Sequence, residues 1–196
     1  ADAGVFAAVS AGNSGPGAKT VGGPANVPWV TGVGATTFPR NYAGQIELGN
    51  GKVYQGTSIT KGTGWKEIVD GAKVGLAGKA NPGFCVEGSL DPAKVKGKVV
   101  LCERGVNGRL AKSSEVQRAG GVGMVLFNAV DVDTMFSDNF FVPTVMMDKT
   151  PGEAIRTYAN STRGAKAKIT NTGINTLPMY SPTLTYFSSR GETVPN

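Results

Sequence analysis

Near its beginning the sequence reads Ser10-Ala11-Gly12-Asn13-Ser14-Gly15-Pro16-Gly17, directly after the apolar run Val5–Ser10 that predicts a buried strand. The octapeptide contains too much glycine for a helix and therefore predicts a loop. Its glycines leave the Asn13 carboxamide exposed and let another backbone approach closely. One interpretation is a hydrogen-bond donor aimed at developing negative charge. The other is a plain turn in which Asn13 tolerates an unusual φ angle, and the octapeptide alone favours this turn.

The composition is that of a globular chain rich in turns. Of 196 residues, 29 are glycine and 11 are proline, and 40% are hydrophobic. These numbers favour strands joined by tight turns over a helical bundle. No apolar run approaches the ~20 residues of a membrane span, so we expect no membrane partner.

The sequence contains no histidine, which excludes several kinds of site from these residues. Neither a Ser-His-Asp triad nor a histidine-ligated catalytic zinc can be assembled from them. We therefore predict no metal and no cofactor. The net charge is +6, but the lysines are scattered and form no basic block, so we also predict no nucleic-acid partner.

The middle of the chain predicts a module rich in strands. Leu48–Tyr54 contains Asn50-Gly51 and predicts a hairpin, because this dipeptide tolerates the positive φ angles of a primed turn. Lys94–Cys102 alternates between lysines and apolar residues, which predicts a half-buried strand with one wet face. Further strands are expected at Val122–Phe127, Thr144–Met147 and Ala165–Thr170.

Two helices accompany these strands. The first is expected over Arg109–Ala119 and ends at Gly120, where a left-handed cap costs little without a Cβ. The second is expected to begin at a Thr150 cap, with Pro151 in the first helical position, and to run to about Ala159.

These patterns divide the chain into two parts. Residues 1–36 and 182–196 are assigned to one domain built on a buried sheet, and residues 37–181 to a module inserted into it. Surface loops accept such insertions because the entropy of loop closure grows only logarithmically with length. The chain begins without an initiator Met or a signal segment, which predicts an internal piece of a longer protein.

Several separate motifs, in the expected order, resemble those of subtilisin-like serine proteases. They are the octapeptide around Asn13, the run Val27-Pro28-Trp29-Val30-Thr31-Gly32-Val33-Gly34-Ala35, and Phe187-Ser188-Ser189-Arg190-Gly191. The run from Gly88 to Cys102, with Ala119-Gly120-Gly121-Val122-Gly123-Met124, resembles the protease-associated (PA) domain inserted in the large plant-type enzymes. The resemblance implies an α/β fragment of a subtilisin-like parallel-sheet core plus an inserted β-rich α+β PA domain.

The resemblance also implies roles for individual residues. In this family the asparagine that matches Asn13 donates its amide to the tetrahedral oxyanion, so Asn13 becomes the candidate catalytic residue. Ala11 and Gly12 match the wall of the pocket for the substrate side chain. The family's Asp, His and Ser are expected outside this chain. We reject Ser58 as the nucleophile, although it ends a Gly-Thr-Ser run, because no helix follows it.

The implied function is that of a segment of a secreted serine endopeptidase, inactive alone for want of the triad. Its expected partners are a polypeptide substrate, the rest of the catalytic domain and, through the insert, a second copy. The insert would modulate substrate access or self-association. The alternative is a stand-alone module for peptide or protein binding or for dimerisation.

Cys85 and Cys102 are the only cysteines, 17 positions apart. A metal site and a reactive thiol are possible interpretations, but two cysteines without histidine make a poor zinc site. If the chain is secreted, as the resemblance implies, a disulfide is the better interpretation.

The segment from 131 to 141 contains two suggestive groups. Asp131, Asp133 and Asp138 lack the spacing of a calcium loop, so we expect a solvated turn. The aromatic residues Phe136, Phe140 and Phe141 are expected to cover the module's core, and the alternative is a contact surface for substrate or a second subunit.

Overall fold

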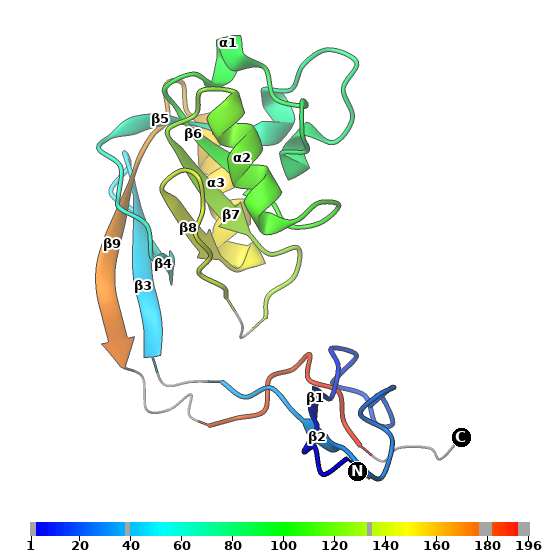
Figure 1. Ribbon diagram of the computed structural model, residues 1–196. Helices are drawn as coiled ribbons and strands as arrows, with labels where there is room; N and C mark the ends of the chain where they lie inside the picture. The colour runs from blue at the N-terminus through cyan, green and yellow to red at the C-terminus, as the bar shows by residue number, and fades with distance from the viewer. Residues whose placement is uncertain (1–2, 38–39, 133–134, 177–181, 192–196) are drawn as a thin grey trace. The chain divides into compact units, whose positions relative to one another are not determined.

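The structure is a computed structural model, and it describes residues 3–37, 40–132, 135–176 and 182–191. The chain divides into two compact units (Figure 1). Unit 1 comprises residues 1–40 and 176–196, and unit 2 comprises residues 41–175. Together they make a mixed α/β structure.

Unit 1 contains one pair of strands in its described part. Strands β1 (Ala8–Ser10) and β2 (Thr31–Val33) lie parallel, with Ser10 opposite Val33. The sequence predicts a buried sheet for this part of the chain, but both strands are largely exposed, because no other described element of unit 1 covers them. The returning segment 182–191 contains no strand and contributes a single β-bridge, between Thr36 and Leu184.

Unit 2 is built on a closed barrel. In its described part the strand order is β3-β4-β8-β7-β6-β5-β9 (Figure 1). The neighbours among β5, β6, β7 and β8 run parallel, whereas β3 and β4 form an antiparallel hairpin. The strands are β3 (Arg40–Leu48), β4 (Val53–Thr57), β5 (Lys66–Asp70), β6 (Val99–Glu103), β7 (Gly123–Phe127), β8 (Thr144–Met147) and β9 (Lys166–Thr176).

The hairpin between β3 and β4 confirms the prediction from Asn50-Gly51. Gly51 has a φ of 82° in the turn, and its N–H donates to the carbonyl of Leu48. Glycine adopts this left-handed conformation without the steric cost that a Cβ would bring.

The central strands of the barrel are buried on both faces. Leu101, Val125 and Val145 belong to one core cluster, which includes Ile155 of helix α3 (Lys149–Ser161). Their neighbours on β6, β7 and β8 belong to a second cluster, which includes Val116 of helix α2 (Arg109–Arg118). Because successive side chains of a strand point to opposite faces, the two helices cover opposite sides of these strands.

The prediction of one half-buried strand over Lys94–Cys102 was wrong. Its beginning forms a short helix, α1 (Pro92–Val95), capped by the Asp91 carboxylate, which accepts a hydrogen bond from the Ala93 N–H. The strand β6 begins only at Val99, and Val100 is buried beneath α2 rather than wet. The alternation of lysines with apolar residues therefore belonged to a helix and a turn.

Helix α2 ends as predicted, with Gly120 at a φ of 79°. Helix α3 begins earlier than predicted, since its N-cap is Asp148 rather than Thr150. Thr150 instead donates from both its N–H and its hydroxyl to the carboxylate of Asp131. An acid from a loop 19 positions earlier thus satisfies the first turn of α3.

Candidate functional site

The predicted catalytic asparagine lies at the start of the loop that joins β1 to β2. The Asn13 side chain is exposed. Within the described part of the chain, no hydrogen bond engages its carboxamide. Neither amide hydrogen is used by a described residue, so both can donate to another group.

The backbone around Asn13 is held by Ser189. The Ser189 N–H donates to the carbonyl oxygen of Gly12 over 2.9 Å. The N–H of Ser14 donates to the Ser189 hydroxyl over 3.0 Å. Asn13 therefore stands between two residues that are bonded to the same serine.

Gly12 allows this close approach. Its φ is 102°, a conformation that side chains rarely adopt. A Cβ at this position would lie 2.8 Å from the Ser189 hydroxyl oxygen. Ala11, the other residue predicted to wall a substrate pocket, is buried, and its N–H donates to the Val33 carbonyl of β2.

The segment that contributes Ser189 also binds the rest of unit 1. The Ser188 hydroxyl accepts a hydrogen bond from the Ala35 N–H over 3.1 Å. The Arg190 N–H donates to the Thr20 hydroxyl, and Phe187 accepts from the Gly15 N–H. Sequence reasoning used this segment only as a family landmark and missed its contacts, although two adjacent serines beside aromatic residues were a visible signal.

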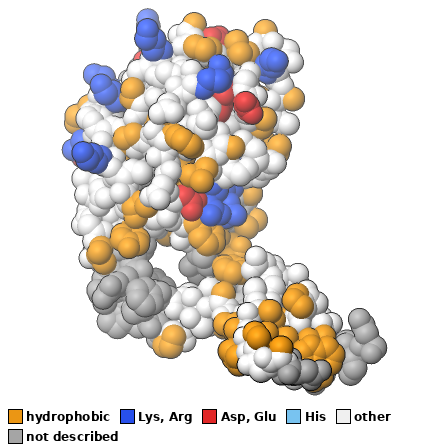
Figure 2. Space-filling view, viewed as in Figure 1, with side chains coloured by type: hydrophobic (Ala, Val, Ile, Leu, Met, Phe, Trp, Pro, Cys, Tyr) orange, Lys and Arg blue, Asp and Glu red, His pale blue; other side chains and the backbone are white. Residues whose placement is uncertain are grey.

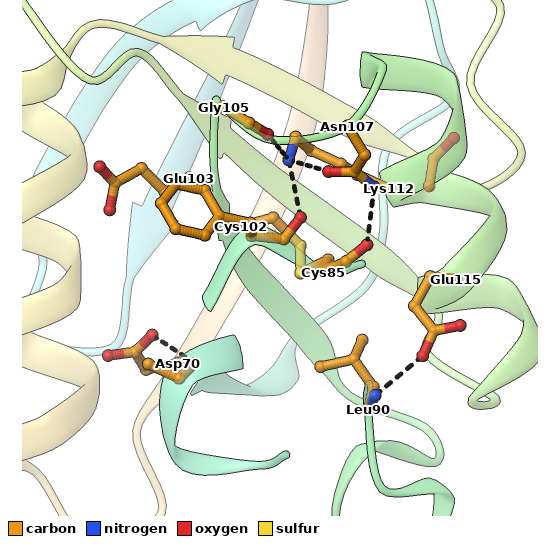
Figure 3. The surroundings of a disulfide bond; sticks show 12 residues. Asp70, Cys85, Leu90, Cys102, Glu103, Gly105, Asn107, Lys112 and Glu115 are labelled. Atoms are coloured by element: carbon orange, nitrogen blue, oxygen red, sulfur yellow. Dashed lines mark hydrogen bonds between the residues drawn. A yellow bond between two sulfur atoms is a disulfide. The ribbon is translucent and has the colours of Figure 1, made fainter. Parts of the chain in front are cut away.

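Unit 2 contains the predicted disulfide. Cys85 and Cys102 are bonded, with their Cα atoms 5.7 Å apart, and both are fully buried (Figure 3). Neither cysteine is available as a metal ligand or a reactive thiol. The bond joins the short helix η2 (Pro82–Phe84) to the core strand β6.

A buried cation lies beside the disulfide (Figure 3). The Lys112 ammonium donates to the carbonyl oxygens of Phe84 and Gly105 and to Oδ1 of Asn107, at 2.7, 2.9 and 2.5 Å. Burial lowers the pKa of this ammonium from 10.5 to about 8, and the positive charge of Arg104 contributes to the decrease. Lys112 holds the loop after β6 against the residues before the disulfide, which is a structural role.

A buried carboxylate of α2 binds the loop that precedes α1. Glu115 accepts hydrogen bonds from the N–H groups of Gly88 and Leu90, at 2.9 and 2.8 Å, and pairs with Arg118. Burial acts to raise its pKa, but the bonds from Arg118, Leu90 and Gly88 outweigh burial and lower the pKa below its usual value. Glu115 is thus an ionised anchor for the loop that precedes α1.

The acidic residues of segment 131–141 have separate partners. Asp131 binds the first turn of α3, and Asp138 pairs with Arg109. Asp133 lies outside the described residues. Among the described side chains, no group of three or more His, Cys, Asp or Glu is placed to hold a metal ion.

The aromatic residues of this segment differ in exposure. Phe136 and Phe140 are partly buried and pack against the core cluster beneath α2, as expected. The Arg109 guanidinium also lies over the Phe136 ring, 4.4 Å from its centre. Phe141 is 55% exposed, so it is accessible to a partner.

The distribution of charge and the character of the helices bear on binding to nucleic acid and membranes. On the face drawn in Figure 2, Lys and Arg side chains lie in separate places rather than in one patch. None of the described helices has the length and the apolar character needed to cross a membrane.

Comparison with known proteins shows what this chain resembles. The PA domain family model matches residues 66–155. The chain is 37% identical to the subtilisin-like protease SBT1.5 of Arabidopsis thaliana, over 97% of this chain and 26% of that protein. It is 38% identical to SBT5.4 of the same plant, over 96% of this chain and 25% of that protein. The chain contains a PA domain and is homologous to a segment of the plant subtilisin-like proteases.

The chain spans about a quarter of the length of the curated relatives it matches. Among solved structures it is similar to the subtilisin-like protease Apa1 from the Antarctic psychrotroph Pseudoalteromonas sp. AS-11. That likeness has 16% identity and a TM-score of 0.48, and covers 96% of this chain and 52% of that one.

Proposed function

We propose that this chain is the segment of a secreted subtilisin-like serine endopeptidase that supplies the oxyanion-stabilising amide, Asn13. The observation that carries the proposal is the state of that amide. It is exposed and makes no hydrogen bond to any described residue, while Ser189 holds the backbone on either side of it. A fixed donor with free hydrogens is what stabilisation of a developing oxyanion requires.

The remaining machinery comes from the rest of the catalytic domain. The chain contains no histidine, so base and nucleophile are supplied by other residues, and the chain alone is inactive. The parallel pair β1–β2 would extend into a larger parallel sheet. The exposed apolar side chains of unit 1, such as Phe6 at 77% and Trp29 at 66%, would be covered by that domain.

Ala11 and Gly12 would wall the pocket that receives the substrate side chain before the scissile bond. They directly precede Asn13, so a polypeptide held beside them would bring its carbonyl close to the amide. The buried disulfide of unit 2 suits an oxidising compartment, which supports secretion.

The experiment replaces Asn13 by Ala in the full-length enzyme. Loss of an oxyanion donor costs on the order of 10²–10³ in kcat, the value known for subtilisin itself, and leaves KM nearly unchanged. Asn26→Ala, in the same β1–β2 connection, is the matched control and should retain full activity. An unchanged kcat in Asn13→Ala would remove Asn13 from the mechanism. Peptidase activity of the isolated chain would contradict the assignment of the triad to other segments.

The second proposed role concerns unit 2, which would modulate substrate access or pair with a second copy. Phe141 favours this role, because it is an exposed aromatic side chain. Light scattering on the full-length enzyme and on its Phe141→Ser variant tests it. A dimer that dissociates in the variant supports pairing through this residue, and a monomeric parent enzyme excludes it.

A further inference from the structure

One buried residue is bonded to both neighbours of Asn13. Ser189 is 5% exposed. Its N–H is bonded to the Gly12 carbonyl oxygen at 2.9 Å, and its hydroxyl accepts from the Ser14 N–H at 3.0 Å. The bond between Ser14 and Ser189 joins residues 175 positions apart in the chain.

These bonds fix the position of the backbone from which the Asn13 side chain projects. No described group holds the carboxamide itself, so within the described part of the chain its position depends on the backbone that carries it. That backbone is the beginning of the long β1–β2 loop, which is rich in glycine and proline. Such a loop by itself would sample many conformations. A donor stabilises a transition state most when its position is established before the reaction.

The sequence around Asn13 is matched to this arrangement. Gly12 has a φ of 102°, and a Cβ there would lie 2.8 Å from the Ser189 hydroxyl oxygen. A larger residue at position 12 would push Ser189 away and break the bond to Ser14. Gly12, which precedes Asn13, thus leaves the space that Ser189 needs to lie close to this backbone.

We propose that Ser189 is the positioning residue of the oxyanion amide, acting through hydrogen bonds to the residues on both sides of Asn13. The inference rests on the proposed role of Asn13. Ser189 touches no reacting atom. Its effect on the reaction passes entirely through the placement of the Asn13 carboxamide.

The test compares two adjacent buried serines in the full-length enzyme. Ser189→Ala removes the hydroxyl that binds Ser14, and Ser188→Ala removes the hydroxyl that binds Ala35. Each loses one buried acceptor of a backbone N–H, so we expect similar losses of thermal stability. Ser189→Ala should lower kcat by about 10-fold with KM within about twofold, since small misplacements of a catalytic group are costly. Ser188→Ala should keep the parent kcat per active site.

A double-mutant cycle separates positioning from a general structural effect. In the Asn13→Ala background there is no amide to place, so adding Ser189→Ala should leave kcat unchanged. An equal loss in both backgrounds, or no loss in the parent background, would overturn the role of Ser189. If Asn13→Ala alone has no effect, the proposed function fails instead, and the two failures are distinguishable.

Active-site titration expresses each kcat per folded enzyme. If Ser189→Ala gives no titratable enzyme, the comparison moves to Ser189→Thr and Ser189→Val, which have similar volume and differ in the hydroxyl. A kcat about 10-fold higher in the threonine variant would support the inference. Equal values in the two variants would refute it.

Discussion

The ammonium nitrogen of Lys112 lies 2.7 Å from the carbonyl oxygen of Phe84, the residue next to the disulfide-bonded Cys85. The cation is fully buried, and all three of its bonds go to neutral oxygens. The Phe84 carbonyl has no other donor among the described residues, whereas the Gly105 carbonyl also accepts from the Asn107 N–H. Helix α2 is thereby joined to the loop that carries the disulfide.

Replacing Lys112 by Met should destabilise unit 2. The variant removes the Lys112 donor from the buried carbonyls of Phe84 and Gly105, and Gly105 alone keeps a second donor, the Asn107 N–H. We therefore expect a loss of about 2–4 kcal/mol in the free energy of unfolding. Urea denaturation followed by the helical circular dichroism signal measures it, because all described helices belong to unit 2. Lys94→Met, at an exposed ion pair with Asp91, is the control and should change the free energy by less than about 0.5 kcal/mol.

The same lysine predicts a pH dependence. Its pKa is about 8 in the folded protein and 10.5 ordinarily, so between these values the unfolded chain binds more protons than the folded one. The contribution of Lys112 to the free energy of unfolding should therefore rise as pH increases from about 8 to 10.5. The difference between the parent chain and Lys112→Met isolates this contribution from the other lysines. A difference that stays constant or falls over this range would contradict the prediction.

Glu115→Gln should destabilise the loop before α1. The substitution removes the ion pair with Arg118 and turns an amide NH₂ toward an N–H donor, for a loss of about 2–4 kcal/mol. The pKa of Glu115 is lowered in the folded state, so its stabilisation is complete above the usual value of 4.5 and is lost as pH falls through the folded value. Denaturation at neutral and acidic pH measures both effects. At neutral pH, Glu67→Gln, at a more exposed pair with Lys98, should lower the free energy of unfolding by less than about 1 kcal/mol.

The disulfide should stabilise unit 2 by about 3 kcal/mol, because it closes a loop in the unfolded chain. Replacing both Cys85 and Cys102 by Ala should lower the free energy of unfolding by this amount. Reductant should destabilise the parent chain and leave the double variant unaffected, which controls for other effects of the reagent. Free thiols in the unreduced, unfolded parent chain would exclude the bond.

Gly152→Ala should destabilise helix α3, although alanine usually favours a helix by about 1 kcal/mol relative to glycine. A Cβ at position 152 would overlap the Phe127 side chain, which is buried in the core. We expect a loss of about 1–3 kcal/mol, measured by denaturation. Gly64→Ala, where a Cβ would meet no atom within 4 Å, is the control. Higher stability in Gly152→Ala would show that the ring moves aside.

Elements with a strong local signal were predictable from the sequence. The Asn50-Gly51 turn and the end of α2 at Gly120 depend on backbone conformations that few residues adopt, so a short stretch of sequence indicates them. The alternation in Lys94–Cys102 was misleading. The Asp91 cap and Pro92 favour a helical turn there, and α2 then buries the face of β6 that we expected to be wet.

The candidate site was predictable only in part. Asn13 and the disulfide partners were named from sequence, whereas the contacts of Ser189 and Lys112 were not. Asp131 was assigned to a solvated turn, and its bond to the start of α3 depends on how two segments pack. Such contacts leave no periodic pattern in the chain.

The sequence by itself determined that these residues cannot supply a histidine-based triad, that two cysteines had only each other as intramolecular partners, and where one hairpin turns. Only the tertiary structure decided that Ser189 forms hydrogen bonds to the residues on both sides of Asn13 and that the Lys112 ammonium binds the carbonyl of Phe84. These bonds join residues 175 and 28 positions apart. Local backbone preferences act over a few residues, so pairings at such distances are selected by the burial and hydrogen bonding of the folded chain as a whole.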